Sequence, residues 1–425
     1  MTFDAVRLAI DHLGRRGEGV AHADGETVYV PYALPGEIVL AERDGERGRV
    51  VETLVARPDR LDPVCPYYGT CGGCAVQTLP PPDYLAWKRD LVVTALAKAG
   101  LDAPVAPTLD AHGAGRRRAT FHSRLEAPRA PPRVGFMQAR AHAIVDLEFC
   151  PILSPGMAGA LPAARRVAAI LSQSGRPLDI VVTATDTGLD LDLRGLGKAS
   201  DEQARALISA AAALGLARLS NHGDVLVEAR PPTLRMGRAA LQMPPGAFLQ
   251  ATEAGEEALA ARVRAGVGGA KRVADLFCGV GTFALRLGEG AAVTAVDSER
   301  AAMAALVRAA AAAPGLRQPK TEVRDLFKRP LAAAELAGFD AVVFDPPRAG
   351  AAAQAAEIAR SGVPRVVAVS CDPGTFARDA AALVAGGYRI EGVEPVDQFR
   401  YSAHVELVAL FTRPAAPAKK RRLLS

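Results

Sequence analysis

A cysteine near the C-terminus stands where a reactive thiolate could act on a substrate. Cys371 follows the apolar stretch VVAVS, and Pro373 and Gly374 come shortly after it. This pattern predicts a buried strand that ends in a turn. A thiolate at such a strand end is a nucleophile, whereas a cysteine inside the strand would be a core residue. The turn favours a nucleophile, because it exposes the side chain.

A carboxyl group suited to proton transfer follows in the segment HVELVALF. Glu406 interrupts the apolar alternation of the last predicted strand, and Asp397, Arg400 and His404 precede it closely. Burial raises the pKa of a carboxyl group, so that it can exchange protons near neutral pH. The alternative role for Glu406 is a salt bridge on an ordinary strand.

The elements that must position these groups are strands that alternate with helices. The segments VADLFCGVG, AVTAVDSE, AVVFDPP and VVAVSCDP are strand-and-turn units, separated by alanine-rich helical stretches between about 248 and 412. Such alternation predicts a doubly wound, Rossmann-like parallel sheet. Open sheets of this kind bind ligands at the carboxyl ends of their strands, which is also where Cys371 lies.

Polar residues at these strand ends favour an adenosine-bearing cofactor. Gly279 and Gly281 would let the backbone approach a ligand closely. Asp297 ends the next strand, about sixteen residues further on, where a carboxylate can accept two ribose hydroxyls. Asp325 lies where an adenine edge could be read, and Asp345 ends the fourth strand. The glycine pattern alone would fit any α/β loop, because the dinucleotide fingerprint is incomplete.

The segment DPPRAG is typical of nucleic-acid methyltransferases with this sheet, in which an acidic or amide residue before Pro-Pro lies beside the reacting base. Pro346 and Pro347 would form a rigid wall with few hydrogen-bonding groups. Arg348 could bind a phosphate or help to hold the base. The alternative is a simple turn at the end of a strand.

Four cysteines have the spacing of a metal site. Cys65, Cys71 and Cys74 form a C-x5-C-x2-C pattern, and Cys150 lies far downstream in DLEFCPIL. Three clustered cysteines and one distant cysteine can bind a 4Fe–4S cluster. Zinc held by four thiolates is the main alternative, because spacing alone seldom separates the two. Disulfides are not expected in a reducing cytosol.

Composition and local patterns predict three domains and a tail. The chain has 425 residues, of which 49% are hydrophobic, and a net charge of +5 that weakly favours polyanionic partners. No apolar run of about 18 residues and no signal peptide is evident, so we expect a cytoplasmic protein without a membrane anchor. We predict a small N-terminal β-barrel at 1–60, an α+β central domain at 61–245, the Rossmann-like domain at 246–413 and a disordered basic tail at 414–425.

These residues together resemble the uracil-5 RNA methyltransferases that use S-adenosylmethionine. That family carries a glycine turn of the DLFCGxG type, DPPR, SCxP and HVE, which stand here as DLFCGVGTF, DPPRAG, SCDPGTF and HVELV in the same order. PGAFLQAT matches a further element of the family, and the resemblance covers essentially the whole chain. Three departures are Thr282 in place of asparagine, Asp297 in place of glutamate, and Arg400 with Ser402 in place of proline and threonine.

The resemblance implies roles for individual residues. Cys371 would add to carbon 6 of uracil, and Glu406 would remove the proton from carbon 5 after methylation. The implied cofactor site consists of Gln250, Phe277, Gly279, Gly281, Thr282, Asp297, Asp325 and Asp345. The target uridine would have to leave its stack to reach the site.

The N-terminal segment GEGVAHADGETVYVPYALPGEIV resembles a TRAM domain, a small OB-like RNA-binding barrel. Candidate phosphate contacts are basic side chains of the first two domains and of DPPRAG, namely Arg15, Arg16, Arg116, Arg117, Arg118, Arg124 and Arg348. Each of these arginines could instead be a solvated surface charge.

A TRAM-like barrel combined with a cysteine cluster points to the branch of the family that modifies 23S ribosomal RNA, and that branch favours iron–sulfur over zinc. We therefore expect an RNA partner, no protein partner and a monomer. A transfer-RNA substrate is the runner-up. A non-catalytic RNA-binding iron–sulfur protein and an amino-group methyltransferase are further alternatives, although neither would need both Cys371 and Glu406.

Overall fold

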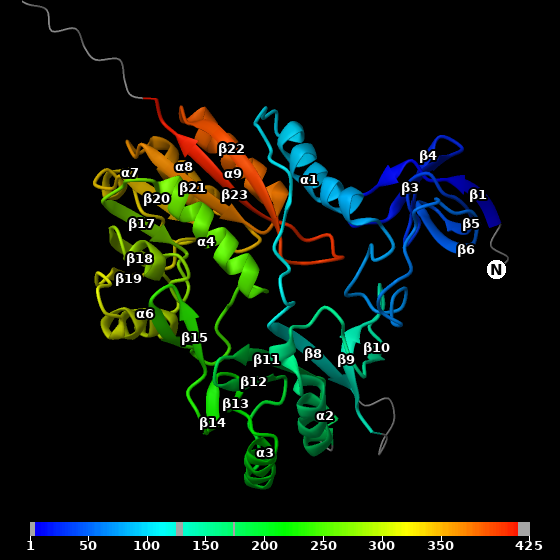
Figure 1. The fold of residues 1–425 in the computed structure, drawn as a ribbon, viewed down its shortest axis with the longest axis horizontal. Coiled ribbons are helices and arrows are strands. Elements are labelled where there is room, and N and C mark those ends of the chain that lie inside the picture. The colour runs from blue at the N-terminus through cyan, green and yellow to red at the C-terminus, as the bar shows by residue number, and fades with distance from the viewer. Residues whose placement is uncertain (1–4, 125–130, 173–174, 415–425) are drawn as a thin grey trace, which may run out of the picture.

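Three large sheets follow one another along the chain (Figure 1). The computed structural model describes residues 5–124, 131–172 and 175–414. The predicted disordered tail lies outside these residues apart from position 414. Within the described ranges, no helix combines the length and apolar character that crossing a membrane requires.

The N-terminal sheet has six strands in the order β1-β5-β6-β4-β3-β2. Its members are β1 (Ala5–Ala9), β2 (His12–Leu13), β3 (Gly19–Ala23), β4 (Glu26–Val30), β5 (Ile38–Asp44) and β6 (Arg47–Val55). The turn between β3 and β4 places Asp24 and Gly25 at φ 54° and 80°, which a tight hairpin turn requires. The described residues show no ladder between β1 and β2, so a closed barrel stays a prediction.

The central sheet has seven strands in the order β10-β9-β8-β11-β12-β13-β14. The strands are β8 (Arg118–Arg124), β9 (Arg133–Met137), β10 (Ile144–Asp146), β11 (Leu178–Thr185), β12 (Gly188–Arg194), β13 (Arg218–Asn221) and β14 (Asp224–Glu228). The short helix η1 (Pro155–Met157), α2 (Ala160–Leu171) and α3 (Asp201–Ala213) add residues to the same core. Strand β8 alternates between buried and half-buried residues, because only one face of the sheet is covered by these helices.

The C-terminal sheet has the order β19-β18-β17-β20-β21-β23-β22-β7, and the first five of these strands are parallel. Its strands are β7 (Leu109–Asp110), β17 (Arg272–Leu276), β18 (Ala292–Asp297), β19 (Lys320–Val323), β20 (Ala341–Phe344), β21 (Arg365–Ser370), β22 (Arg389–Asp397) and β23 (Glu406–Thr412). The strands run backward in sequence from β19 to β17 and then forward through β20 and β21. This reversal at β17 confirms the predicted doubly wound sheet.

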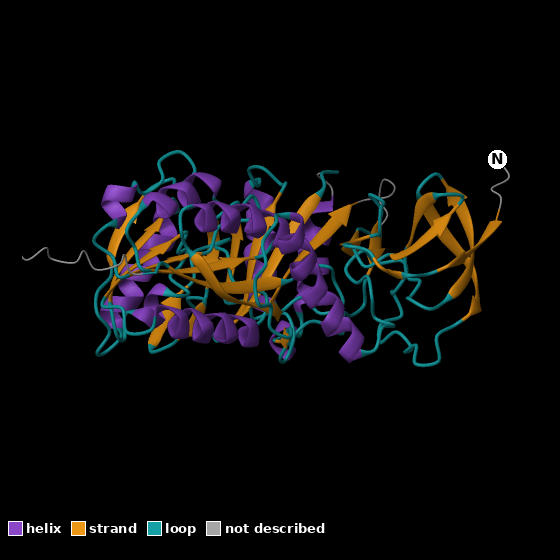
Figure 2. Cartoon of the chain, turned by 90° about the horizontal axis from the view of Figure 1, so that it is seen from above, coloured by secondary structure: helices purple, strands orange, loops and turns teal. Residues whose placement is uncertain are grey.

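Helices cover both faces of this sheet, as Figure 2 shows from above. The helices of the C-terminal half are α4 (Glu253–Val267), α5 (Ala284–Leu287), α6 (Arg300–Ala312), α7 (Ala333–Leu336), α8 (Ala352–Arg360) and α9 (Pro373–Ala385). Val273 belongs to the core under α4 and α6, whereas its neighbour Ala274 belongs to the core under α8 and α9. Because strand side chains alternate, each parallel strand must be apolar on both faces.

Two segments from the predicted central region pack on the C-terminal sheet. Helix α1 (Pro81–Lys98) adds Val92 and Leu96 to the core under α8 and α9. The hairpin of β15 (Thr233–Met236) and β16 (Ala239–Gln242) adds Leu234 and Leu241 to the core under α4 and α6. The C-terminal sheet is therefore completed by residues from well before its first long strand.

We predict that the two glycines of the turn after β17 differ in their tolerance of alanine. Both have positive φ, at 54° for Gly279 and 92° for Gly281, which costs an alanine about 1 kcal/mol. A Cβ at Gly281 would also lie 2.4 Å from Cδ1 of the buried Leu306, whereas a Cβ at Gly279 meets nothing within 4 Å. Gly281→Ala should therefore lose about 1–3 kcal/mol more stability than Gly279→Ala in urea unfolding followed by circular dichroism. Equal losses would contradict the predicted steric conflict.

Candidate active site

Cys371 lies directly after β21, where the chain turns into α9. The turn is held by Asp372, whose Oδ1 accepts hydrogen bonds from the backbone N–H groups of Gly374 at 2.8 Å and Thr375 at 3.0 Å. This N-cap fixes the start of α9 and leaves the preceding thiol outside the strand. The cysteine is half-buried at the carboxyl edge of the sheet, as its sequence context predicts.

The surroundings of this thiol disfavour its charged form. Burial, with the nearby acidic groups Glu406 and Asp345, raises the pKa of Cys371 to about 12, while Arg348 opposes the shift. Very little thiolate forms at neutral pH with such a pKa. A positive charge bound next to the thiol would lower the pKa and activate the nucleophile.

Two carboxyl groups share the edge of the sheet with the thiol. The antiparallel register pairs Ser370 with Leu407, which brings Glu406 to the strand end beside Cys371. Burial raises the pKa of both Asp345 and Glu406, and the charge of Asp345 raises that of Glu406 further. A negative charge on Asp345 therefore disfavours ionisation of Glu406.

Two buried glutamines connect these acids. Gln398 Nε2 donates to Gln250 Oε1 at 2.6 Å, and Gln250 Nε2 donates to Asp345 Oδ2 at 3.4 Å. Gln398 also hydrogen-bonds to Glu406, which lowers the pKa of that acid against the effect of burial. The sequence does not single out Gln398, because its partners lie far away along the chain.

A buried ion pair holds the loop that leads into Glu406. Lys88 Nζ donates to Asp397 Oδ1 at 2.9 Å, to the carbonyl of Phe399 at 3.4 Å and to the carbonyl of His404. Lys88 and Asp397 are both fully buried. All three ammonium protons are therefore used, and both ends of the loop 397–405 are fixed to α1.

Helix α1 also contacts the active-site loop through Tyr84 and the N-terminal sheet region through Trp87. Tyr84 donates its hydroxyl to Asp397 Oδ2 at 2.5 Å and accepts from the backbone N–H of Tyr401 at 2.9 Å. One residue before Lys88, Trp87 Nε1 donates to the carbonyl of Gly14 at 3.2 Å. Helix α1 thus joins the N-terminal part of the chain to the active-site loop.

Planar side chains form a row beside the thiol. Arg348 donates to His404 Nε2 at 3.1 Å, and the His404 ring meets the Phe399 ring edge-on at 5.8 Å. Desolvation of the imidazole and the positive charge of Arg348 lower the pKa of His404, although its side chain reaches the surface, so the neutral ring can accept this hydrogen bond. The guanidinium of Arg116 lies 5.5 Å from the centre of the Phe399 ring. Rows of aromatic and guanidinium planes are typical of sites that bind unstacked bases.

The glycine turn and its neighbours build a polar cradle at the adjacent strand ends. The backbone N–H of Gly279 donates to Asp297 Oδ2 at 2.9 Å, and Phe277 has a positive φ of 59°. The rings of Phe277 and Phe327 lie 5.5 Å apart, and Asp325 Oδ1 accepts from the backbone N–H of Phe327 at 3.0 Å.

The predicted cofactor residues are connected through the strands that carry them. The backbone N–H of Asp345 donates to the carbonyl of Leu276, just before the glycine turn, at 3.2 Å. Thr282 lies half-buried at the end of the turn, and its carbonyl accepts from Arg286 at 2.8 Å. The cradle and the thiol therefore occupy the same edge of the sheet, which suits a cofactor that reacts beside Cys371.

A buried aspartate near the cradle is missing from the sequence prediction. Asp275 is fully buried on β17, and within the described part of the chain neither of its carboxyl oxygens has a hydrogen-bond partner. Burial, followed by the charge of Asp345, raises the pKa of Asp275 far above its ordinary value. Its signal in the sequence is an acidic residue within the apolar strand VADLF.

The four predicted metal-binding cysteines line one cavity. Cys65, Cys71, Cys74 and Cys150 face it together with the apolar residues Tyr67, Phe136, Leu147, Phe149 and Ile152. Among the described residues, no group of three or more histidine, cysteine, aspartate or glutamate side chains is arranged to hold a metal ion. The structure thus gathers the four thiols without a tight site for a single ion.

The prediction that Arg117 contacts RNA is not supported by its position. Arg117 is only 8% exposed, and its guanidinium donates to Glu256 Oε2 at 2.5 Å and to the carbonyl of Gln250 at 3.3 Å. A paired guanidinium in the core cannot reach a phosphate. Its role is to fix the segment that carries Gln250 against α4.

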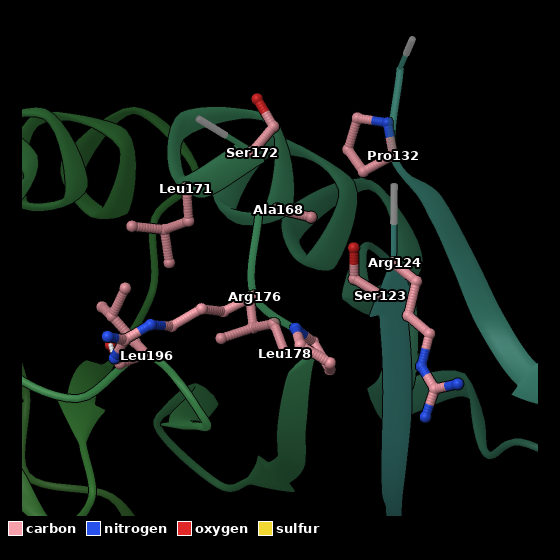
Figure 3. A pocket seen from close by; sticks show the side chains of 10 residues that line it. Ser123, Arg124, Pro132, Ala168, Leu171, Ser172, Arg176, Leu178 and Leu196 are labelled. Atoms are coloured by element: carbon pink, nitrogen blue, oxygen red, sulfur yellow. Dashed lines mark hydrogen bonds between the residues drawn. The ribbon is translucent and has the colours of Figure 1, made fainter. Parts of the chain in front are cut away.

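The other arginines lie in different surroundings. Arg118 is half-buried on β8 close to Asp190 and Arg194. Arg124 donates to the carbonyl of His142 at 3.1 Å and borders a small crevice between α2 and β8, where Figure 3 shows its side chain along the strand. Contacts of these two residues with RNA stay predictions.

Comparisons with known proteins identify the family of this chain. Residues 244–414 match the family model tRNA (Uracil-5-)-methyltransferase. An uncharacterized RNA methyltransferase of Brucella suis is 46% identical over 96% of this chain and 98% of its own length. The 23S rRNA (uracil(1939)-C(5))-methyltransferase RlmD of Pseudomonas fluorescens is 34% identical over 95% of this chain and 93% of its own length.

A solved structure shares the whole fold. The tRNA (uracil-54, C5)-methyltransferase of Pyrococcus abyssi, in complex with S-adenosyl-L-homocysteine, superimposes with a TM-score of 0.74 at 24% identity, over 96% of this chain and 99% of the other. The sequence relatives are similar over nearly their full length, and the matched family model covers the cradle, the thiol and the two carboxyl groups. The chain therefore belongs to the RNA (uracil-5-)-methyltransferase family, and it is an enzyme that methylates carbon 5 of uracil in RNA with S-adenosylmethionine.

Proposed function

We propose that the enzyme methylates a uridine of 23S ribosomal RNA, with Cys371 as the nucleophile and Glu406 as the base. The observation that carries the catalytic assignment is the register of β21 and β23, which brings the thiol and the buried carboxyl to one strand end. Two features support the ribosomal substrate. One is a full-length relative named as a 23S rRNA methyltransferase, and the other is the gathering of four cysteines in one cavity.

In the proposed reaction, the residues of this chain make carbon 5 nucleophilic and then remove its proton. S-adenosylmethionine, when bound, supplies a methyl group on a positively charged sulfur. The Cys371 thiolate adds to carbon 6, and the electron pair of the carbon 5–carbon 6 double bond moves toward the carbonyl. After methylation, Glu406 takes the proton of carbon 5, and the carbon–sulfur bond breaks to restore the double bond.

The remaining polar groups would bind and orient the reactants. Asp345 is a carboxyl held by Gln250 beside the thiol, so its negative charge would favour a cationic sulfur at this position. A cation there would lower the pKa of Cys371 and couple activation of the nucleophile to occupancy of the cofactor site. Arg348 and the neutral His404 would contact the target nucleotide from the other side.

We propose that the cysteine cavity holds a 4Fe–4S cluster bound by Cys65, Cys71, Cys74 and Cys150. The four thiols face one cavity, as ligands of a single metal centre must. Zinc held by the same four thiolates is the alternative, because cysteine ligands alone do not separate the two metal centres. The methyl transfer needs no electrons, so the proposed role is structural.

The substrate assignment predicts the outcome of a direct assay. The enzyme, purified without oxygen, would be supplied with S-adenosylmethionine carrying a labelled methyl group and with unmodified ribosomal RNA or unmodified transfer RNA. We expect labelled 5-methyluridine from ribosomal RNA alone, identified by mass spectrometry after digestion. The same nucleoside from transfer RNA alone would contradict the ribosomal assignment. A labelled amino-methylated base would contradict the Cys371 mechanism.

The catalytic roles predict a trapped intermediate. The Glu406→Gln variant should still form the covalent bond between Cys371 and methylated RNA. It should not release the methylated RNA, because no base removes the carbon 5 proton. Turnover should fall at least about 100-fold, with a protein–RNA adduct that resists denaturing gel electrophoresis. Cys371→Ala should abolish both turnover and adduct.

A matched control is Glu394→Gln, a change of a half-exposed acid on the neighbouring strand β22. This variant should turn over without accumulating the adduct. If Glu406→Gln releases product at the wild-type rate, Glu406 is not the base.

The cluster assignment predicts iron and sulfide in stoichiometric amounts. Enzyme purified without oxygen should contain iron and acid-labile sulfide in equal amounts, and Cys74→Ser should lose both. Because the cavity lies apart from the thiol, binding of S-adenosylmethionine measured by calorimetry should persist in Cys74→Ser. Zinc in place of iron and sulfide would show that the cavity holds a different metal.

A further inference from the structure

A cavity of about 450 Å³ lies outside the cradle and the thiol site, where three parts of the chain meet. Its walls come from the turn before β3 with Arg16, the residue Tyr32 after β4, the cysteine loop 72–75 and the segment 136–140 that leaves β9. Figure 1 shows the loop after β6 running between the N-terminal sheet and the β9–β10 edge of the central sheet. The volume falls within the range of small-molecule sites and can hold a nucleobase with its ribose.

The charges in this cavity favour an anionic ligand. Arg16, Arg116 and Arg140 line it together with one acid, Glu18, so the three guanidinium groups leave a net charge of two positive units. Arg140 lies 3.0 Å from Glu18 and neutralises that acid. The Nε atom of Arg116 is buried without a hydrogen-bond partner among the described residues. A guanidinium with an unused donor in a cavity suits a phosphate or a base edge.

Aromatic and strained residues in the same walls point to a ligand with flat rings. Tyr32 and Phe136 contribute rings to the lining, and an edge-on contact at 5.0 Å with Tyr68 fixes the Tyr32 ring. Tyr32 and Arg140 have positive φ values of 67° and 59°. Such backbone strain in residues other than glycine is concentrated at functional sites.

Arg116 connects this cavity with the active site. It lines the cavity, and its guanidinium also lies 5.5 Å from the Phe399 ring, which in turn meets His404 beside Arg348. A single strand of RNA that places its uridine at the thiol would pass this row of planar groups. We propose that the cavity, named here the junction pocket, binds a second, unstacked nucleotide of the RNA substrate.

In this arrangement, the arginines hold the phosphate of the second nucleotide, and Tyr32 and Phe136 stack on its base. This proposal rests on the proposed function, because it takes the ligand to be the substrate RNA. Gly73 and Cys74 line both the junction pocket and the cysteine cavity. The cysteine loop is therefore a shared wall, and a group bound by the four thiols would set the shape of the pocket.

The first test compares two tyrosines that lie close together in the sequence. Tyr32→Ala should weaken binding of an unmodified ribosomal RNA fragment by full-length enzyme about tenfold, because one stacked base is lost. Tyr29→Ala changes a tyrosine that is 38% exposed on β4 and does not line the pocket, so its RNA affinity should stay within twofold of wild type. Tyr32→Phe keeps the ring and should bind like wild type. Filter binding measures these affinities.

Binding of S-adenosylmethionine, measured by calorimetry, should be the same in all three variants. Equal binding would show that the variants are folded. Equal RNA affinity of Tyr32→Ala, Tyr29→Ala and wild type would overturn the proposal. Loss of RNA affinity in both alanine variants would also overturn it, because the effect would not be specific to the pocket.

A second measurement needs no variant. Wild-type enzyme and the RNA fragment would be cross-linked by ultraviolet light, digested and analysed by mass spectrometry. We expect nucleotide adducts on peptides that contain Tyr32 or residues 136–140, and adducts confined to other surfaces would overturn the proposal. A methylation assay with the same RNA fragment tests the proposed function separately. If that assay shows no methylation, the cross-linked peptides still show where the RNA binds.

Discussion

The buried ion pair between Lys88 and Asp397 is the interaction on which the active site depends. The ammonium and the carboxylate are fully buried, and the ammonium also holds the carbonyls of Phe399 and His404. Removing one partner would leave an unpaired charge in the core, which costs about 3–5 kcal/mol. A helix from the first quarter of the chain therefore holds the loop that leads into the last strand and its Glu406.

The surroundings of the reactive groups disfavour negative charge on them. Burial raises the pKa of Cys371, Asp345 and Glu406 together, and each negative charge that forms disfavours the next. The cofactor of this family carries a positive sulfur, whereas the product of methyl transfer from it is neutral. A site of this kind is therefore expected to favour the thiolate while a methyl group is available and to disfavour it afterwards.

Residues whose positions follow from local pattern and topology could be predicted from the sequence. Strand and turn signals place Cys371 and Asp345 at strand ends, and a parallel sheet must bring those ends to one edge. Lys88 and Gln398 could not be found in this way, because their partners come from distant segments that meet only in the folded chain. The pairing of Arg117 could not be found for the same reason. A run of three arginines suggests an RNA surface, but the buried Glu256 on α4 pairs with the middle one.

Arg116 shows how the parts of the molecule are coupled. It belongs to the same arginine run, yet it lies between the cysteine cavity, the junction pocket and the Phe399 ring. The thiols of Cys150 and Cys74 contribute to its electrostatic surroundings, while its other side faces the loop that Lys88 holds. The guanidinium of Arg116 therefore lines the junction pocket, lies against the loop that Lys88 holds and is affected by the charge of the cysteine thiols. A cluster bound by those thiols, as proposed above, would act on RNA binding through Arg116 without any transfer of electrons.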